Sequence, residues 1–202
     1  MAEQRIATPS VLMELREERQ VVKDGYRFLD EKRLLLAAEI LRQLEEYERL
    51  QRNYLQLQRA AAAALASAAA RHGLQGLQVH PAMAMDAAPL QQQRRRFLGV
   101  QLLECSLVLP EEATATAVDP SPEARHCAHL FRKLVQHSAP LAAISGNLER
   151  LLQEYRRTER RARALEDVLL PELEQALGEI VVRLEELDQE EAVRVRRDYG
   201  KR

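Results

Sequence analysis

The chain has 202 residues, with 30 basic and 31 acidic side chains and a formal net charge of −1. This balance gives no overall attraction toward nucleic acid or an anionic membrane. Charged residues make up 30% of the chain and aromatic residues 4%, while Ala, Leu, Glu, Arg and Gln dominate. Such a composition is typical of long helices or coiled coils and disfavours a fold built on a sheet.

Cysteine usage and hydropathy predict a protein of a reducing compartment. Cys105 and Cys127 do not form a disulfide framework, and the first residues lack the apolar segment of a secretory signal. The longest apolar run, residues 60–70, is mostly alanine and far shorter than the ~20 residues that a membrane span needs. We therefore expect a cytoplasmic protein without direct membrane insertion.

A coiled-coil helix is predicted to begin near Thr8, Pro9 and Ser10, because a hydroxyl cap and an early proline suit a first turn. A heptad repeat follows, and it is strong evidence for a helix–helix seam. The a positions are Leu12, Arg19, Tyr26, Arg33, Ile40, Tyr47, Tyr54 and Ala61, and the d positions are Leu15, Val22, Leu29, Leu36, Gln43, Leu50, Leu57 and Ala64. The aliphatic stems of Arg19 and Arg33 can line the seam while their charges reach water.

The first helix is expected to end at His72 and Gly73, since glycine is a common C-terminal stop. The alanine tract before it, residues 60–70, has two interpretations. It could keep the helix thin so that another surface approaches closely, or it could be low-complexity drift.

Residues 73–121 are predicted to form a small, partly β insertion, because the helical period is lost and prolines gather there. The best strand candidate covers residues 97–109, and residues 77–85 are the expected partner, confined to an edge by Pro81. Arg94, Arg95 and Arg96 are expected in a solvated turn before the strand. Residues 111–120 are expected to form an exposed loop.

A second long helix is predicted over residues 122–202, opened by Pro122 and Glu123, with bends expected near residues 138–140 and 171. Its seam residues are spaced alternately three and four positions apart until residue 169. The next spacing, across Pro171, is four where three is due. Local unwinding would accommodate both this slip and the hydrogen bond that the proline removes. The seam residues are Leu141, Ile144, Leu148, Leu151, Tyr155, Thr158, Ala162, Leu165 and Leu169, then Leu173, Leu177, Ile180, Leu184 and Leu187. We expect this helix to pair with the one over residues 1–72.

Sites for chemistry are not evident in the sequence. The glycines form no phosphate-binding loop, and the acidic residues follow solvated helix faces. His126, Cys127 and His129 share a stretch of helix but lack a second ligand pair with zinc-type spacing. We expect no catalytic residue, no metal site and no cofactor.

A basic cluster precedes Pro171. Five arginines fall within about two turns of helix: Arg156, Arg157, Arg160, Arg161 and Arg163. Nearby glutamates can offset part of this charge within the helix. Either the cluster is such a solvated face, or it forms a collar of charge that faces acidic groups of a surrounding protein; nucleic-acid binding is not expected.

Two segments resemble the D subunit of the A-type/V-type rotary ATPases, the central rotor shaft. Residues 25–36, which read GYRFLDEKRLLL, are similar to the family pattern Gly-x-x-Leu-Leu-Lys-x-Lys-Arg-x-x-Leu, with Phe28 and Asp30 as departures. The Asp30 departure removes a positive charge from that pattern, so an ionic contact made there by the family's lysine is not carried over. Residues 160–174, with their arginine pair and Pro171, resemble the second family segment, which continues to residue 191.

The resemblance implies a non-catalytic central-stalk subunit, built as a long antiparallel two-helix coiled coil with a small hairpin insertion. The implied partners are the catalytic A and B subunits of the ring, the small F subunit and the socket subunit of the membrane rotor, at the cytoplasmic face of the membrane. Rotation of such a shaft would couple ATP hydrolysis or synthesis to ion translocation. The implied contact residues are Gly25, Leu29, Lys32, Arg33, Arg160, Arg161, Leu165, Pro171 and Leu173. A stand-alone coiled-coil scaffold or tether is the alternative; it would explain the heptads but not the two motifs together.

Overall fold

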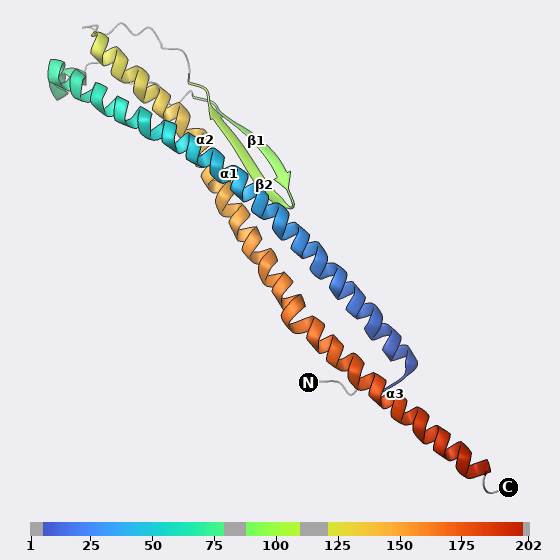
Figure 1. Cartoon of the computed structure of the whole chain (residues 1–202). Helices are drawn as coiled ribbons and strands as arrows, with labels where there is room; N and C mark the ends of the chain where they lie inside the picture. Colours follow the sequence, from blue (N-terminus) through green and yellow to red (C-terminus); the bar gives the residue numbers. More distant parts are fainter. Residues whose placement is uncertain (1–5, 79–87, 110–120, 200–202) are drawn as a thin grey trace. The chain divides into compact units, whose positions relative to one another are not determined.

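The computed structural model describes residues 6–78, 88–109 and 121–199, apart from the side chain of residue 198. Its elements are α1 (Pro9–Leu77), β1 (Leu90–Phe97), β2 (Val100–Leu107), α2 (Pro122–Ala164), a π-helical segment η1 (Leu165–Leu169) and α3 (Leu170–Tyr199) (Figure 1). The described chain is therefore mostly helical, with an antiparallel β1–β2 hairpin inserted between the helices. This confirms the predicted fold class.

Side-chain caps begin both long helices. The backbone N–H of Val11 donates to Thr8 Oγ1 at 3.3 Å, directly before Pro9 at the first helical position. The N–H of Ala124 donates to Ser121 Oγ, also at 3.3 Å, and Pro122 follows that cap. Each cap satisfies a backbone donor that the first turn leaves unpaired, and proline at the first position has no donor to lose.

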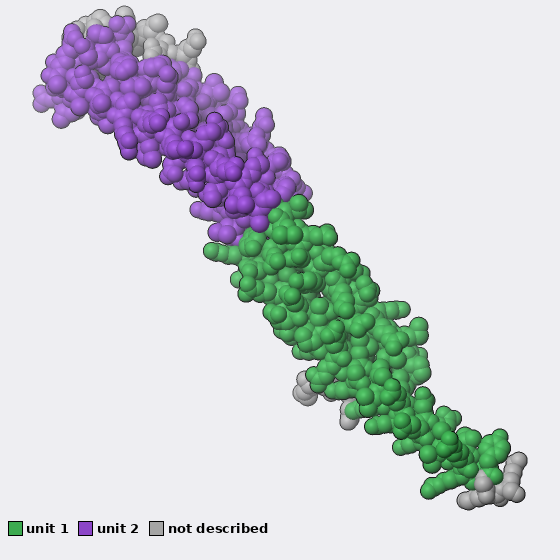
Figure 2. Space-filling model, viewed as in Figure 1, with its two compact units in different colours: residues 1–35, 155–202 green, residues 36–154 purple. Residues whose placement is uncertain are grey.

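The chain divides into two compact units, Met1–Leu35 with Tyr155–Arg202 and Leu36–Glu154 (Figure 2). We call them the terminal unit and the hairpin unit. In the terminal unit, Leu15 of α1 packs with Leu173, Leu177 and Ile180 of α3. Further along α1, the position of Gly25 approaches Leu165. Rising numbers on one helix meet falling numbers on the other, so the pairing is antiparallel.

The hairpin unit pairs its own parts of α1 and α2. Ala64 and Ala68 form a buried cluster with Cys127, and Arg71 pairs with Glu123 at 2.5 Å. These contacts also run antiparallel. The buried alanines show that the alanine tract permits close helix approach, which supports the first of its two interpretations.

The predicted heptad of α1 is confirmed, because every a and d position from Leu12 to Ala64 is buried or half-buried. The second seam is confirmed with two exceptions, since Leu169 and Leu187 are exposed. Leu187 lies beyond the last residues that pack in the Leu15 cluster. Leu169 ends the π segment, where the seam changes register.

The slip predicted at Pro171 takes the form of the π segment η1, in which the N–H of Leu170 donates to the carbonyl of Leu165. A π turn accommodates one extra residue, so it absorbs the four-residue step from Leu169 to Leu173. In a regular helix the ring of Pro171 would clash with the carbonyl four residues earlier, and the wider π turn lies at this place. At the other interior proline, Pro140, α2 continues on both sides.

The strand prediction was wrong in its bounds and in the place of the arginines. β2 pairs with Leu90–Phe97, and Arg94, Arg95 and Arg96 belong to β1, not to a turn. Residues 79–85 of the predicted partner strand lie outside the described residues. Leu98 and Gly99 form the turn, with φ of 47° and 91°. Two successive positive φ values suit the right-handed twist of a hairpin, and glycine adopts them without strain. The predicted strand 97–109 therefore contains this turn at its start.

Two further expectations concern the end of the first helix and the loop over residues 111–120. The helical assignment of α1 continues to Leu77, although Gly73 itself has φ 70° and ψ 163° and interrupts the helix. The predicted loop over residues 111–120 lies outside the described residues.

Candidate functional site

All nine residues that the family resemblance singles out lie in the terminal unit. Gly25, Leu29, Lys32 and Arg33 are on α1, Arg160 and Arg161 on α2, Leu165 in η1, and Pro171 and Leu173 on α3. The two motifs, more than a hundred residues apart in sequence, therefore occupy one antiparallel helix pair.

Gly25 and Leu165 bring the motifs into contact. A Cβ atom added to Gly25 would lie 3.7 Å from Leu165 Cδ1, which is ordinary van der Waals contact. Next to them, desolvation and the nearby Glu166 carboxylate raise the pKa of the Tyr26 phenol. The first motif thus packs directly on the π segment that precedes Pro171.

The departure at Asp30 creates an internal ion pair. Arg33 Nη2 donates to Asp30 Oδ1 at 2.6 Å, one turn away on the same helix. Both side chains are about one-third exposed. The arginine charge at this a position of the heptad is therefore compensated within the chain, while Leu29 and Lys32 are half-buried beside it.

The arginine cluster of α2 faces outward. Arg163 pairs with Glu159 at 2.7 Å, as the intrahelical interpretation expects. The other four, Arg156, Arg157, Arg160 and Arg161, are exposed. None of these four has a carboxylate within ion-pair distance in the described part of the chain. Pairing within the helix accordingly accounts for one of the five charges.

An apolar stripe follows the outer side of α1 in the same unit. Val21, Phe28 and Leu35 are spaced seven residues apart and are 70%, 65% and 53% exposed. They all occupy the c position of the heptad, away from the a and d seam. Phe28, the other departure from the family motif, is in the middle of this stripe. Large exposed apolar side chains in a row are typical of a surface that another protein covers.

The remaining motif residues have different environments. Leu173 is 6% exposed and belongs to the core cluster around Leu15. Pro171 is exposed, directly after the π segment. Leu173 therefore holds the helix pair together, and Pro171 marks the register change.

A polar network that was not predicted from the sequence attaches the hairpin to the helices in the hairpin unit. The Glu39 side chain is 8% exposed and accepts hydrogen bonds from Arg42 and Gln43 of its own helix and from Arg95 of β1. The Arg42 hydrogen bonds are the main cause that lowers the pKa of Glu39 to about 2. Glu39 is adjacent to the a position Ile40, but nothing in the local sequence shows that a strand covers it.

Asn147 of α2 is the second missed residue, 3% exposed. Its Nδ2 donates to the carbonyl of Leu103, and its Oδ1 accepts from the N–H of Leu103, each at 2.8 Å. A single asparagine on a seam-bordering face was the available signal.

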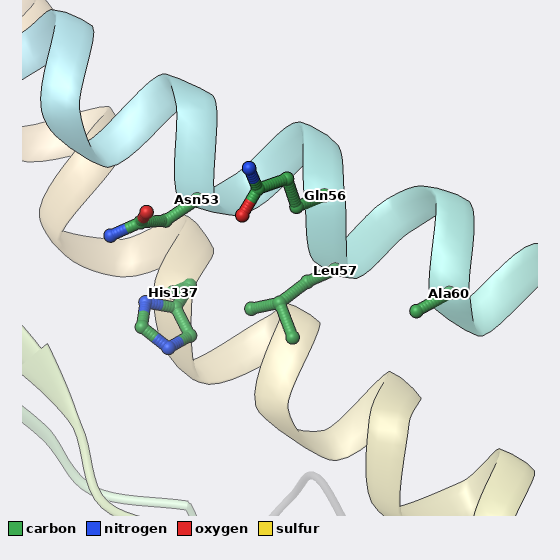
Figure 3. A pocket seen from close by; sticks show the side chains of 5 residues that line it. All are labelled: Asn53, Gln56, Leu57, Ala60 and His137. Atoms are coloured by element: carbon green, nitrogen blue, oxygen red, sulfur yellow. The ribbon is translucent and has the colours of Figure 1, made fainter.

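Other features of the described residues suggest no chemistry. An open pocket of the hairpin unit is lined by Asn53, Gln56, Leu57 and Ala60 of α1 and His137 of α2 (Figure 3). Its lining holds no carboxylate or thiol. Across the described chain, no group of three or more His, Cys, Asp or Glu side chains is arranged to hold a metal ion. No described helix combines the length and hydropathy that crossing a bilayer requires.

Comparison with known proteins gives one consistent result. A family model described as the D subunit of ATP synthase matches residues 11–197. The chain is 31% identical over 192 residues to the D subunit of a V-type ATP synthase from Anaeromyxobacter dehalogenans, covering 92% of this chain and 91% of the relative. It is 26% identical over 187 residues to the D subunit of a V-type ATP synthase from Thermotoga neapolitana, covering 92% of each. The D subunit of an A-type ATP synthase from Methanoregula boonei is 27% identical over 194 residues, 94% of this chain and 93% of that protein.

Proposed function

We propose that this chain, which belongs to the family of ATP synthase D subunits, is the non-catalytic central shaft of a rotary V/A-type ATP synthase. In this role it couples ATP hydrolysis or synthesis in a ring of A and B subunits to ion translocation. The small F subunit and the socket subunit of the membrane rotor are its other proposed partners, at the cytoplasmic face of the membrane.

The observation that carries this proposal is the outer surface of the terminal unit. The exposed stripe of Val21, Phe28 and Leu35 and the uncompensated arginines of α2 belong to the same helix pair. An isolated coiled-coil tether needs a buried seam but no outward apolar stripe. A shaft enclosed by a ring needs both, because its outer faces must contact the surrounding subunits.

Coupling through a shaft requires that its faces differ. The apolar stripe is on α1, and the arginine cluster is on α2. A ring subunit that faces the stripe meets a different surface from one that faces the arginines. Rotation would then change the affinity of each catalytic site in turn, which is coupling through differential contacts. The proposed contact residues are Gly25, Leu29, Lys32, Arg33, Arg160, Arg161, Leu165, Pro171 and Leu173.

Truncation tests the role directly. A chain ending after Ala164 lacks η1 and α3, and in the reconstituted complex we expect ATP hydrolysis to continue without ion movement. A matched chain ending after Leu187 keeps the packed residues Leu173, Leu177 and Ile180 and serves as the control. Ion pumping by the shorter chain at the level of the control would contradict the proposal.

Because the deep truncation also removes part of the core, a surface variant is needed. Replacing Val21, Phe28 and Leu35 by glutamine changes only exposed side chains, so the helix content and thermal unfolding should be preserved. We expect the ratio of ions moved to ATP hydrolysed to fall. Recovery of the wild-type chain as a stable homodimer that does not join the ring would instead favour the scaffold alternative.

A further inference from the structure

The β1–β2 hairpin has two backbone edges, and the hydrogen-bond register shows which groups point outward. The N–H of Val108 donates to the carbonyl of Pro89, which extends the β1–β2 ladder by one bonded pair. Bonded and non-bonded pairs alternate along an antiparallel ladder. The pairs Gln92–Cys105, Arg94–Leu103 and Arg96–Gln101 are therefore non-bonded, and their backbone groups point away from the partner strand.

The outer edge of β2 is occupied at Gln101 and Leu103. Asn147 binds both backbone groups of Leu103, and Arg150 Nη1 lies 3.5 Å from the carbonyl of Gln101. Side chains of α2 thus take the place of a neighbouring strand on this edge. The ladder register places the backbone groups of Leu103 outward, and Asn147 binds these same groups. The two observations therefore agree on which residues face outward.

The outer edge of β1 is open. Gln91 to Arg96 are all exposed. Among the described residues, no hydrogen bond reaches the backbone of Gln92, Arg94 or Arg96. Figure 1 shows β1 on the side of the hairpin away from α1 and α2 within the hairpin unit.

The positive charge of β1 that has no partner among the described residues lies on one face of the strand. Arg95 points to the face that meets α1, where it forms an ion pair with Glu39 at 2.9 Å. Arg94 and Arg96 share the opposite face with Gln92, since side chains alternate along a strand. Neither has a carboxylate within ion-pair distance in the described chain, and Glu104 lies on the Arg95 face because it pairs with Gln93.

We propose that the open edge of β1 binds an extended acidic segment of another protein as a third strand. The backbone of Gln92, Arg94 and Arg96 would supply the ladder, and two carboxylates at alternate positions of the partner would lie opposite Arg94 and Arg96. The inference is argued from the hairpin geometry. Its first test rests on the proposed function, because that test places the partner in the assembled ATP synthase, whereas the peptide tests need only the full-length chain.

The first experiment measures amide hydrogen exchange of the full-length chain, alone and in the assembled ATP synthase. We expect the outward amides of Gln92, Arg94 and Arg96 to become protected at least about tenfold in the complex. Equal exchange in the two states would overturn the proposal and leave the arginines as a guard against edge-to-edge aggregation.

The second experiment separates backbone pairing from charge, using a blocked peptide of β-branched residues with two glutamates two residues apart. NMR titration against the full-length chain should shift the outward amides. Arg94→Glu with Arg96→Glu should weaken binding about tenfold or more, whereas Arg94→Lys with Arg96→Lys should retain it. Equal binding by a peptide with lysines in place of the glutamates would also overturn the proposal.

Gln92→Pro tests the backbone alone. It removes one outward N–H, keeps both arginines and spares the β1–β2 ladder, a position where an edge strand tolerates proline. We expect the ladder amides of β2 to stay protected while peptide binding falls about tenfold. Unchanged peptide affinity with an intact ladder would contradict strand addition.

Discussion

Asn147 holds the backbone of Leu103 through both ends of its side-chain amide, with two hydrogen bonds of 2.8 Å. This pair joins α2 to the outer edge of β2. A two-stranded hairpin alone is marginally stable, so its position on the helices depends on such contacts.

Replacing Asn147 by Ala should release this edge. Two backbone groups of Leu103 lose their partners, at about 1–3 kcal/mol for each that stays buried. We expect the amide of Leu103 to exchange faster and the hairpin to loosen while the helices remain. Asn147→Asp keeps the acceptor but loses the donor. The exchange rate of the Leu103 amide in this variant should lie between the rates in the wild type and in the alanine variant. Unchanged exchange at Leu103 in the alanine variant would contradict this account.

The lowered pKa of Glu39 predicts that its contact with the hairpin is sensitive to acid. Its pKa falls from an ordinary value of 4.5 to about 2, chiefly through its hydrogen bonds with Arg42. A lowered pKa contributes stability that is fully present above pH 4.5 and is lost as the pH falls toward 2. The whole contribution is on the order of 3 kcal/mol. The Arg42 bonds within the helix make the largest part of it, so the contact with Arg95 of β1 accounts for a smaller share.

Hydrogen exchange of β1 and β2 amides across this pH range would measure the effect of Glu39. Glu39→Gln should remove most of the dependence. Glu46→Gln is the matched control, because Glu46 forms a similar pair with Arg49 but is more exposed and bonds no strand residue. An equal loss of pH dependence in both variants would assign it to helix charge in general.

Gly25 permits a stabilising substitution. An added Cβ would meet Leu165 Cδ1 at 3.7 Å without overlap, and alanine favours a helix interior by about 1 kcal/mol over glycine. We therefore expect Gly25→Ala to raise the free energy of unfolding by about 0.5–1 kcal/mol. Gly25→Leu, too large for this space, should lower it. Thermal unfolding of the two variants measures both changes. Destabilisation by alanine would show that the contact with Leu165 is tighter than the distance indicates.

Pro171→Ala tests whether the register change is used. The extra residue between Leu169 and Leu173 remains, so the π segment should persist and the Leu15 cluster should stay packed. Since the wide turn already relieves the proline clash, stability should rise by less than about 3 kcal/mol. We expect the complex to assemble with reduced ATP turnover. Turnover equal to the wild type would mean that the proline is tolerated but not needed.

The helix pairing followed from the sequence because a coiled-coil seam is a local, repeating signal. The heptad of α1 and the alternation of α2 and α3 each predicted their own buried faces, down to the slip at Pro171. The start of α1 at Thr8 and Pro9 was predicted for the same reason. Each depends on residues only a few positions apart.

What the tertiary structure decided was the hairpin and its attachment. The polar run Gln91 to Arg96 has no apolar alternation, so β1 is a strand only because β2 and the Leu98–Gly99 turn bring it into register. Glu39, Arg95 and Asn147 meet their partners across 44 to 56 residues of chain. Those partners are backbone atoms and charges from distant segments, and no periodic pattern encodes such contacts.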